Sequence, residues 1–369
     1  MKTDSFDFDL PEHLIAQYPT EQRGRSRLLV LDRKTGNTID SMVEDIVSFI
    51  EPGTLMVFND SKVRKARLYG TCEQTGTIVE FVFLSPWKQD DPTSLGDSSS
   101  DHESQGDLVK ACKPISTVSR LWRAICNKSK QQKIGRSYMF PGQLRGSIIE
   151  DRGHEKTIEF SFIVGDEYFD RNGHVPLPPY IKREDTSDDE LRYQTVYAKH
   201  TGSAASPTAG LHFTPQLLDE LSRKGIEIEY LTLHIGLGTF QPVRADNVED
   251  HQMHEEWFDI SLEAADKINL ALSEGRKVLA VGTTSMRALE SAWYGGKVKH
   301  GNFSTRIFIY PGYEFHVVDS LFTNFHTPKS TLLMLVSAFA GREKILECYR
   351  LAIEKNYRFF SYGDAMLIL

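Results

Sequence analysis

The sequence has little of what marks redox, metal-thiolate, secreted or membrane proteins. It contains four cysteines in 369 residues and no Cys-x-x-Cys pair, which argues against a thiolate zinc site and is typical of a reducing compartment. Its best membrane candidate, residues 331–340, is about half the length that a spanning helix needs. The first residues lack the apolar core of a secretory signal. We therefore expect a cytoplasmic protein with no membrane attachment.

Motifs of several common enzyme classes are also missing. There is no His-Glu-x-x-His run and no GxxxxGK spacing, and the segment from His234 to Gly238 lacks the third glycine of a dinucleotide-binding turn. A net charge of −8 gives no support to a generic nucleic-acid binder. The sequence thus disfavours a P-loop nucleotidase and a nicotinamide enzyme, and it gives only weak support to a metallohydrolase.

What is present predicts a two-part α/β protein. The chain is longer than the usual single core, and its 40% hydrophobic and 25% charged residues are ordinary for a globular protein. Alternating β-branched and aromatic runs predict a small antiparallel β-barrel over residues 68–164. This barrel is inserted in a mixed α/β domain of residues 1–67 and 165–369. Within the barrel, an acidic segment at about 89–107 has too few apolar residues to fold and is predicted to be a disordered loop.

The α/β domain should alternate strands with helices. Apolar periodicity and capping residues predict helices over 41–50, 215–224, 262–275 and 286–293, one that begins at 328, and one over 342–355. Strands are predicted over 54–58, 226–233, 277–282, 306–310 and 315–323.

The densest group of chemically useful residues lies between 206 and 254. Four of the 12 histidines fall there, beside glycines that let a ligand approach the backbone: His212, His234, His251 and His254. Three of them could hold a metal, or a histidine next to Asp250 could act as an acid or base. Structural histidines are the remaining alternative.

Two other stretches predict binding of anions. The run Thr283-Thr284-Ser285 lies between a predicted strand and a helix, with Arg287 one turn on, and helix starts favour carboxylates or phosphates. Plain helix capping is the alternative. The basic strip from Arg120 to Arg136 could contact phosphates and stack a base on Trp122. Alternatively, it is a hairpin with a charged outer face and its tryptophan in the core.

Taken together, the motifs resemble one family closely and over nearly the whole chain. The residues that carry the resemblance are Pro207-Thr208-Ala209-Gly210-Leu211-His212-Phe213, His234 to Val243, Asp250-His251 with His254, Val281 to Ser285, Thr323 to His326, Tyr357 to Met366, Phe58-Asn59-Asp60 with Arg64 and Arg67, Pro176 to Ile181, and Tyr193 to Tyr197. The chain resembles the S-adenosylmethionine:tRNA ribosyltransferase-isomerases of queuosine biosynthesis.

The resemblance implies an enzyme that transfers the ribosyl part of S-adenosylmethionine to a 7-aminomethyl-7-deazaguanine at the wobble position of tRNA. Isomerisation gives epoxyqueuosine, with adenine and methionine released. S-adenosylmethionine is then a co-substrate, no metal or tightly bound cofactor is implied, and the partner is a tRNA with a GUN anticodon. The implied fold is a mixed α/β domain with an inserted barrel, in a monomer.

This chemistry needs a base, a proton donor for adenine, an anion site for the methionine carboxylate and cations for RNA. The predicted catalytic residues are His212, His234, Asp250, His251 and His326. The predicted substrate-binding residues are Asp60, Arg64, Arg67, Tyr180, Thr208, Gly210, Gly236, Gly238, Thr239, His254, Thr283, Thr284, Arg287, Asn324 and Asp364. Two alternatives remain open: a metal-dependent hydrolase that uses His234, His251 and His254, and a non-catalytic tRNA-binding protein.

Overall fold

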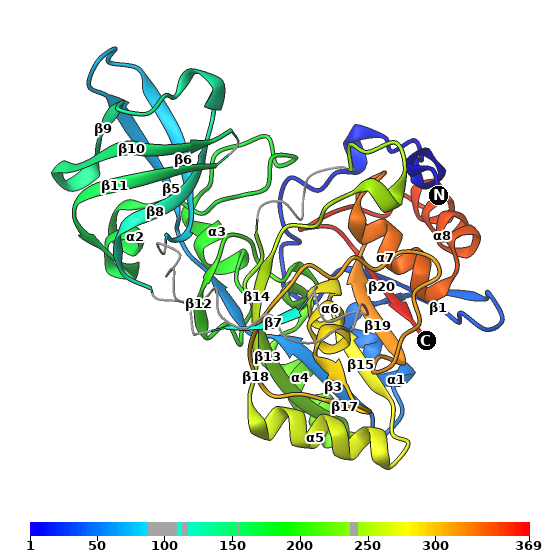
Figure 1. The fold of residues 1–369 in the computed structure, drawn as a ribbon. Helices are drawn as coiled ribbons and strands as arrows, with labels where there is room; N and C mark the ends of the chain where they lie inside the picture. The colour runs from blue at the N-terminus through cyan, green and yellow to red at the C-terminus, as the bar shows by residue number, and fades with distance from the viewer. Residues whose placement is uncertain (88–108, 113–116, 154, 237–242) are drawn as a thin grey trace.

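The computed structural model has two parts, a layered α/β body and a small β-barrel (Figure 1). It describes residues 1–87, 109–112, 117–153, 155–236 and 243–369. The predicted acidic loop, as well as Gly238 and Thr239, lies outside these residues.

A ten-stranded mixed sheet forms the body. In spatial order its strands are β2 (Thr38–Met42), β1 (Arg27–Leu31), β20 (Ala365–Ile368), β19 (Ser320–Asn324), β15 (Val278–Val281), β3 (Leu55–Asn59), β13 (Glu227–Leu233), β14 (Glu256–Ile260), β18 (Gly301–Thr305) and β7 (Val109–Ala111). The neighbours β13, β3, β15 and β19 run parallel. Their carboxyl ends therefore meet at one edge of the sheet, which we call the carboxyl edge.

Helices cover both faces of this sheet. Alternate residues of a strand point to opposite faces, so Leu29 and Leu31 join one core cluster while Leu28 and Val30 join the other. The first cluster includes residues of α5 (Leu262–Ser273), α6 (Thr283–Ala292), α7 (Thr331–Ala340) and α8 (Arg342–Glu354). The second includes residues of α1 (Ile46–Phe49) and α4 (Pro215–Arg223). The result is a three-layer α/β/α body.

The barrel is closed by six antiparallel strands. In spatial order they are β10 (Leu144–Arg152), β11 (Glu155–Val164), β8 (Ser119–Cys126), β6 (Ile78–Pro86), β5 (Arg67–Cys72) and β9 (Ser137–Phe140). Aromatic residues fill its interior, and Trp122 is fully buried among them. The alternative that placed this tryptophan in the core is therefore correct, and Trp122 is not available to stack a base.

Short elements join the two parts. Strand β4 (Ser61–Val63) pairs in parallel with β12 (His200–Ser203), and α2 (Asp166–Asn172) and α3 (Ser187–Arg192) follow the barrel in sequence. Strand β7 falls within the range predicted for the barrel, yet it pairs with β18 at the edge of the large sheet. Part of the predicted barrel segment thus belongs structurally to the α/β body.

Most of the predicted elements form, and the capping residues act as expected. Thr214 and Ser261 accept hydrogen bonds from the first turns of α4 and α5, and Gly225 follows α4 with a φ of 84°. The helix predicted over 41–50 shrinks to α1, because Ser41 and Met42 end β2. The strand predicted over 306–310 is wrong: these residues carry no strand pairing, and β18 ends at Thr305.

Candidate active site

The carboxyl edge gathers many of the predicted site residues. Asn59 ends β3, His234 follows β13, Thr283 follows β15 by one residue, and Asn324 ends β19. A short 3₁₀ helix, Thr208–His212, lies over this edge, since a Cβ on Gly282 would lie 3.5 Å from the Cβ of Ala209. Ligand sites in open α/β sheets lie beyond the carboxyl ends of parallel strands. The topology therefore makes this edge the first candidate for the active site.

His234 is held tightly at this edge. Its ring stacks on Trp257, with centroids 5.0 Å apart and planes 16° apart. Gly202 lies so close that a Cβ there would be 2.8 Å from Cε1 and Nε2 of the ring. Burial, assisted by the charge of Arg64, lowers the pKa of His234 to about 3. Its Nδ1 is buried and has no hydrogen-bond partner among the described residues. His234 is therefore neutral at pH 7, with one ring nitrogen uncommitted.

Asn59 and Asp60 connect this histidine to the sheet. Asn59 Oδ1 accepts hydrogen bonds from the backbone N–H groups of Ser61 and Leu233 at 3.0 Å each, and its Nδ2 donates to Leu233 O and to Thr284 Oγ1. Asp60 accepts a 2.6 Å hydrogen bond from Thr232 Oγ1. Burial raises the pKa of Asp60. These contacts fix the two residues that precede His234, Thr232 and Leu233.

The Thr208–His212 segment contributes a second histidine, His212, which is buried. Gly210 is required there, because a Cβ would lie 2.1 Å from the Tyr197 hydroxyl. The ring of His212 packs edge-on against Phe322 at 5.7 Å. Burial lowers its pKa to about 4, although the Asn324 side chain acts in the opposite direction. Its Nε2 has no partner among the described residues.

Asn324 and His326 follow β19. Asn324 Nδ2 donates to Phe360 O at 2.9 Å, while its Oδ1 is buried and unpartnered within the described ranges. His326 Nε2 lies 3.0 Å from Thr323 Oγ1, and burial lowers its pKa to about 3. His212 and His326 are buried and His234 is half-buried, and burial lowers the pKa of all three. Of these, His326 has its Nε2 committed to a neighbouring side chain.

Protein contacts engage much of the predicted anion turn, although Nε and Nη2 of Arg287 are buried without a partner among the described residues. Thr283 and Thr284 are buried at the start of α6, and Ser285 Oγ donates to Val281 O. Arg287 is 3% exposed and forms an ion pair with Glu256, itself 4% exposed. Because a carboxylate already neutralises Arg287, this guanidinium is poorly suited to bind the methionine carboxylate.

Arg64 and Arg67 are also engaged inside the protein. Arg64 is 2% exposed, pairs with Asp166 at 2.6 Å and lies over the ring of Trp122 at 5.0 Å. Arg67 donates to Leu177 O at 2.8 Å and pairs with Glu80 at 3.2 Å. Neither is presented to solvent as a contact to a tRNA phosphate requires. Both instead tie the barrel to the segments beside it.

Other predicted residues have structural partners. Asp364 accepts hydrogen bonds from the backbone N–H groups of Arg27 and Arg358, and the Tyr180 hydroxyl lies 2.6 Å from Ser361 Oγ. Gly236 N donates to Glu256 Oε1 at 3.3 Å. Thr208 begins the 3₁₀ helix described above.

The His251 loop does not form the predicted histidine–carboxylate pair. Asp250 accepts from Asn247 Nδ2 at 2.8 Å, whereas His251 packs edge-on against Phe308 at 5.3 Å. Burial, with a contribution from His254, lowers the pKa of His251. In the described part of the chain, no three His, Cys, Asp or Glu side chains cluster as a metal site would. The metal-hydrolase alternative therefore has no geometric support there.

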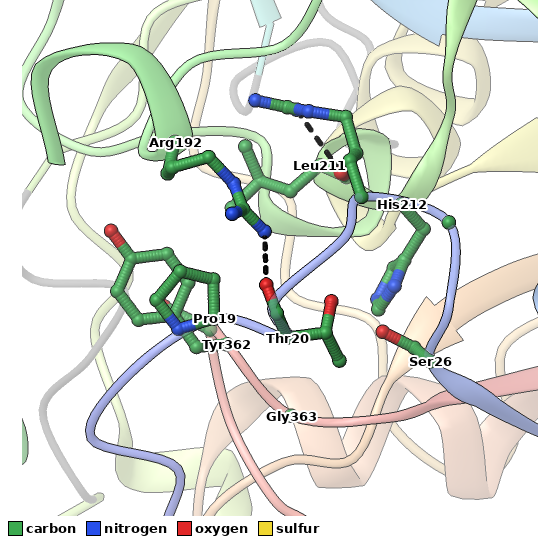
Figure 2. Close-up of a pocket in the computed structure, with 11 residues that line it drawn as sticks. Pro19, Thr20, Ser26, Arg192, Leu211, His212, Tyr362 and Gly363 are labelled. Carbon is green, nitrogen blue, oxygen red and sulfur yellow. Dashed lines mark hydrogen bonds between the residues drawn. The ribbon is translucent and has the colours of Figure 1, made fainter. Parts of the chain in front are cut away.

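Three residues near the site were missed by the sequence-based prediction. Trp257 and Gly202 confine His234, and Arg192 lines a small cavity beside His212 (Figure 2). None carries a local sequence signal, because each acts through a residue distant in the chain.

Comparison with known proteins agrees with the motifs. The family model described as "Queuosine biosynthesis protein" matches residues 3–368. A protein of Treponema denticola named S-adenosylmethionine:tRNA ribosyltransferase-isomerase is 47% identical, and one of Clostridioides difficile with the same name is 44% identical; both alignments cover all of each chain. A crystal structure of S-adenosylmethionine tRNA ribosyltransferase from Thermotoga maritima is 32% identical, covers 99% of this chain and 100% of that one, and superposes with a TM-score of 0.54.

Proposed function

The chain belongs to the S-adenosylmethionine:tRNA ribosyltransferase-isomerase family of queuosine biosynthesis, and from this premise we propose that its carboxyl edge is the active site. The reaction transfers and isomerises the ribosyl moiety of S-adenosylmethionine onto the 7-aminomethyl-7-deazaguanine wobble base of tRNA. It gives epoxyqueuosine-tRNA, adenine and methionine. The tRNA carries a GUN anticodon, and the enzyme acts as a cytoplasmic monomer. In the described ranges, no helix has both the length and the apolar character needed to cross a bilayer.

One observation carries the assignment of the site. Buried polar atoms without a partner among the described residues gather around the carboxyl edge: Ser206 Oγ, His212 Nε2, His234 Nδ1 and Asn324 Oδ1. A buried polar group left unpaired costs about 1–3 kcal/mol, so folded proteins rarely keep several together. A polar substrate that pairs with these atoms would offset that cost on binding.

His234 is the proposed base. The sulfonium acidifies the adjacent ribose carbon, and a neutral imidazole with a free nitrogen can accept the proton released there. A pKa of about 3 keeps His234 unprotonated in the free protein at neutral pH. Because this pKa makes His234 a weak base, the protonated ring must be stabilised by the negative charge that develops on the ribose carbon as the proton leaves. His251 is half-buried and lacks the proposed carboxylate partner, which makes it the weaker candidate.

The tRNA surface is proposed to include the turn between β8 and β9. Lys128, Lys130 and Lys133 are exposed there and form no ion pair with a described residue, whereas Arg120 and Arg123 lie within 4 Å of glutamates. Phosphates bind to exposed cations, and each contact adds to the salt dependence of affinity. The barrel, with bounds of 68–164, is therefore proposed as an RNA-facing insertion in the catalytic domain of 1–67 and 165–369.

The decisive experiment is incubation of the full chain with S-adenosylmethionine and tRNA bearing the 7-aminomethyl-7-deazaguanine precursor, followed by assay of released adenine. His234→Gln should stay folded and turn over about 100-fold more slowly or worse, as expected for loss of a general base. A protein that binds the tRNA but releases no adenine would be the non-catalytic RNA-binding alternative. Activity that is lost with a chelator and restored by zinc would support the metal-dependent one.

A further inference from the structure

A small polar cavity lies beside His212, next to the carboxyl edge. It is lined by residues of four separate segments, among them Arg23, Ser26, Arg192 and His212. Ser26 precedes β1, and Gly363 on the opposite wall closely precedes β20. Both strands begin at the edge where β19 ends, since β20 is antiparallel to β19 and parallel to β1. The cavity therefore lies at the same edge of the sheet as the proposed active site.

Two arginines of this cavity have no carboxylate partner among the described residues. Arg23 donates only to carbonyl oxygens, those of Gln194, Leu211 and Leu191, at 2.9–3.1 Å. Arg192 donates to the carbonyls of Thr20 and Glu21 at 2.6 and 3.3 Å (Figure 2). A guanidinium has five N–H donors, so both keep donors uncommitted. The pKa of Arg23 is lowered first by burial and then by the charge of Arg192.

The remaining walls also suit an anion. Figure 2 shows the ring of His212 directed toward the hydroxyl of Ser26, across the cavity. Ser26 is buried, and its hydroxyl has no hydrogen bond to a described residue. Asp189, which accepts a hydrogen bond from the hydroxyl of the cavity residue Tyr362, is already paired with Arg183. No carboxylate of the described residues forms an ion pair with Arg23 or Arg192, although the more distant Asp188 partly offsets the charge of Arg23.

We infer that this cavity binds the α-carboxylate of the methionine part of S-adenosylmethionine through Arg192, Arg23 and Ser26. The inference rests on the proposed function and adds where one end of its co-substrate lies. A terminal carboxylate can enter a cavity whose walls include the buried residues Ser26, His212 and Gly363. A backbone phosphate of tRNA, attached to ribose on both sides, fits such a cavity less well. Arg287, by contrast, is neutralised by Glu256.

The test compares S-adenosylmethionine with its decarboxylated analogue, which keeps the sulfonium, the ribose and the adenine. Adenine release is measured with saturating precursor tRNA, and the ratio of kcat/KM for the two sulfonium compounds is the readout. The wild-type enzyme should prefer the carboxylate form by about 10- to 150-fold, the range expected for one charged hydrogen bond. Arg192→Gln should lower kcat/KM for S-adenosylmethionine but not for the decarboxylated analogue. Most of the preference should therefore be lost. Ser26→Ala should reduce it by a smaller factor.

Arg223→Gln, which changes a highly exposed arginine on α4, is the matched control and should keep the wild-type ratio. The inference is overturned if the wild type does not discriminate between the two compounds, or if a folded Arg192→Gln or Ser26→Ala variant keeps the full preference. It is also overturned if Arg192→Gln keeps the preference but weakens tRNA binding, because the anion is then a phosphate. A wild type that releases no adenine from either compound would instead refute the proposed function.

Discussion

A substitution at Gly202 gives the most direct test of the role of His234, because it displaces the imidazole ring without changing the histidine itself. A methyl group added at Gly202 would lie 2.8 Å from two atoms of the imidazole and 3.1 Å from a third. An ordinary contact between such atoms is about 3.5 Å, so the ring or the strand must shift by roughly 0.7 Å. The ring is also stacked on Trp257, which restricts the directions in which it can move.

A displacement of this size should be visible in catalysis. Misplacement of a reacting group by about 1 Å can cost about 100-fold in rate. We therefore expect Gly202→Ala to lower kcat for adenine release by about 10- to 100-fold while the protein stays folded. The assay is steady-state adenine release with both substrates saturating, alongside thermal unfolding.

Two comparisons separate the ring displacement from other effects. Gly301 has a positive φ of 127° in β18, and a Cβ there would make only an ordinary 3.5 Å contact with Phe303. Gly301→Ala thus reports the backbone cost of alanine without disturbing the site. In the His234→Gln background, Gly202→Ala should lower kcat little further, because the effects of substitutions at two contacting residues are not additive. Normal turnover in a folded Gly202→Ala, or full additivity in the double variant, would refute this reasoning.

Three further predictions follow from the charges. Arg287→Met should lower the free energy of unfolding by about 3–5 kcal/mol, measured by urea denaturation, because it removes the cation that is paired with the buried Glu256; an unchanged stability would contradict the buried pair. His212, His234 and His326 each have a folded pKa below the unfolded value of about 6.5, so stability is fully present above that pH and falls as the pH drops through 6.5 toward the folded pKa. Between pH 7.5 and 5.5 this amounts to about 1.4 kcal/mol per histidine, and His326→Asn should remove one such contribution from the urea-derived pH dependence. Changing Lys128, Lys130 and Lys133 to glutamine should weaken tRNA binding and flatten its salt dependence, and an unchanged salt slope would exclude this turn from the RNA surface.

Local sequence determined much of the α/β body. The apolar runs that became β3 and β15 are nearly continuous, as expected for strands covered on both faces, and Thr214 and Ser261 cap their helices through contacts within one turn. The motif residues His212, His234 and Asn324 were likewise recognisable, since the family resemblance rests on short segments. Such features depend on neighbours within a few positions, so they can be read from the chain alone.

Whether each charged side chain is paired with an opposite charge was decided only by the tertiary structure. Arg64 meets Asp166 across 102 positions and Arg287 meets Glu256 across 31, and these pairings withdraw two predicted ligand-binding arginines from solvent. Arg192, which has no motif around it, lines a cavity whose lining residues include no carboxylate. The sequence specifies that a cation is present. Whether that cation is neutralised depends on which distant carboxylate the packing of the two parts brings within hydrogen-bonding distance, and that is a property of the folded chain.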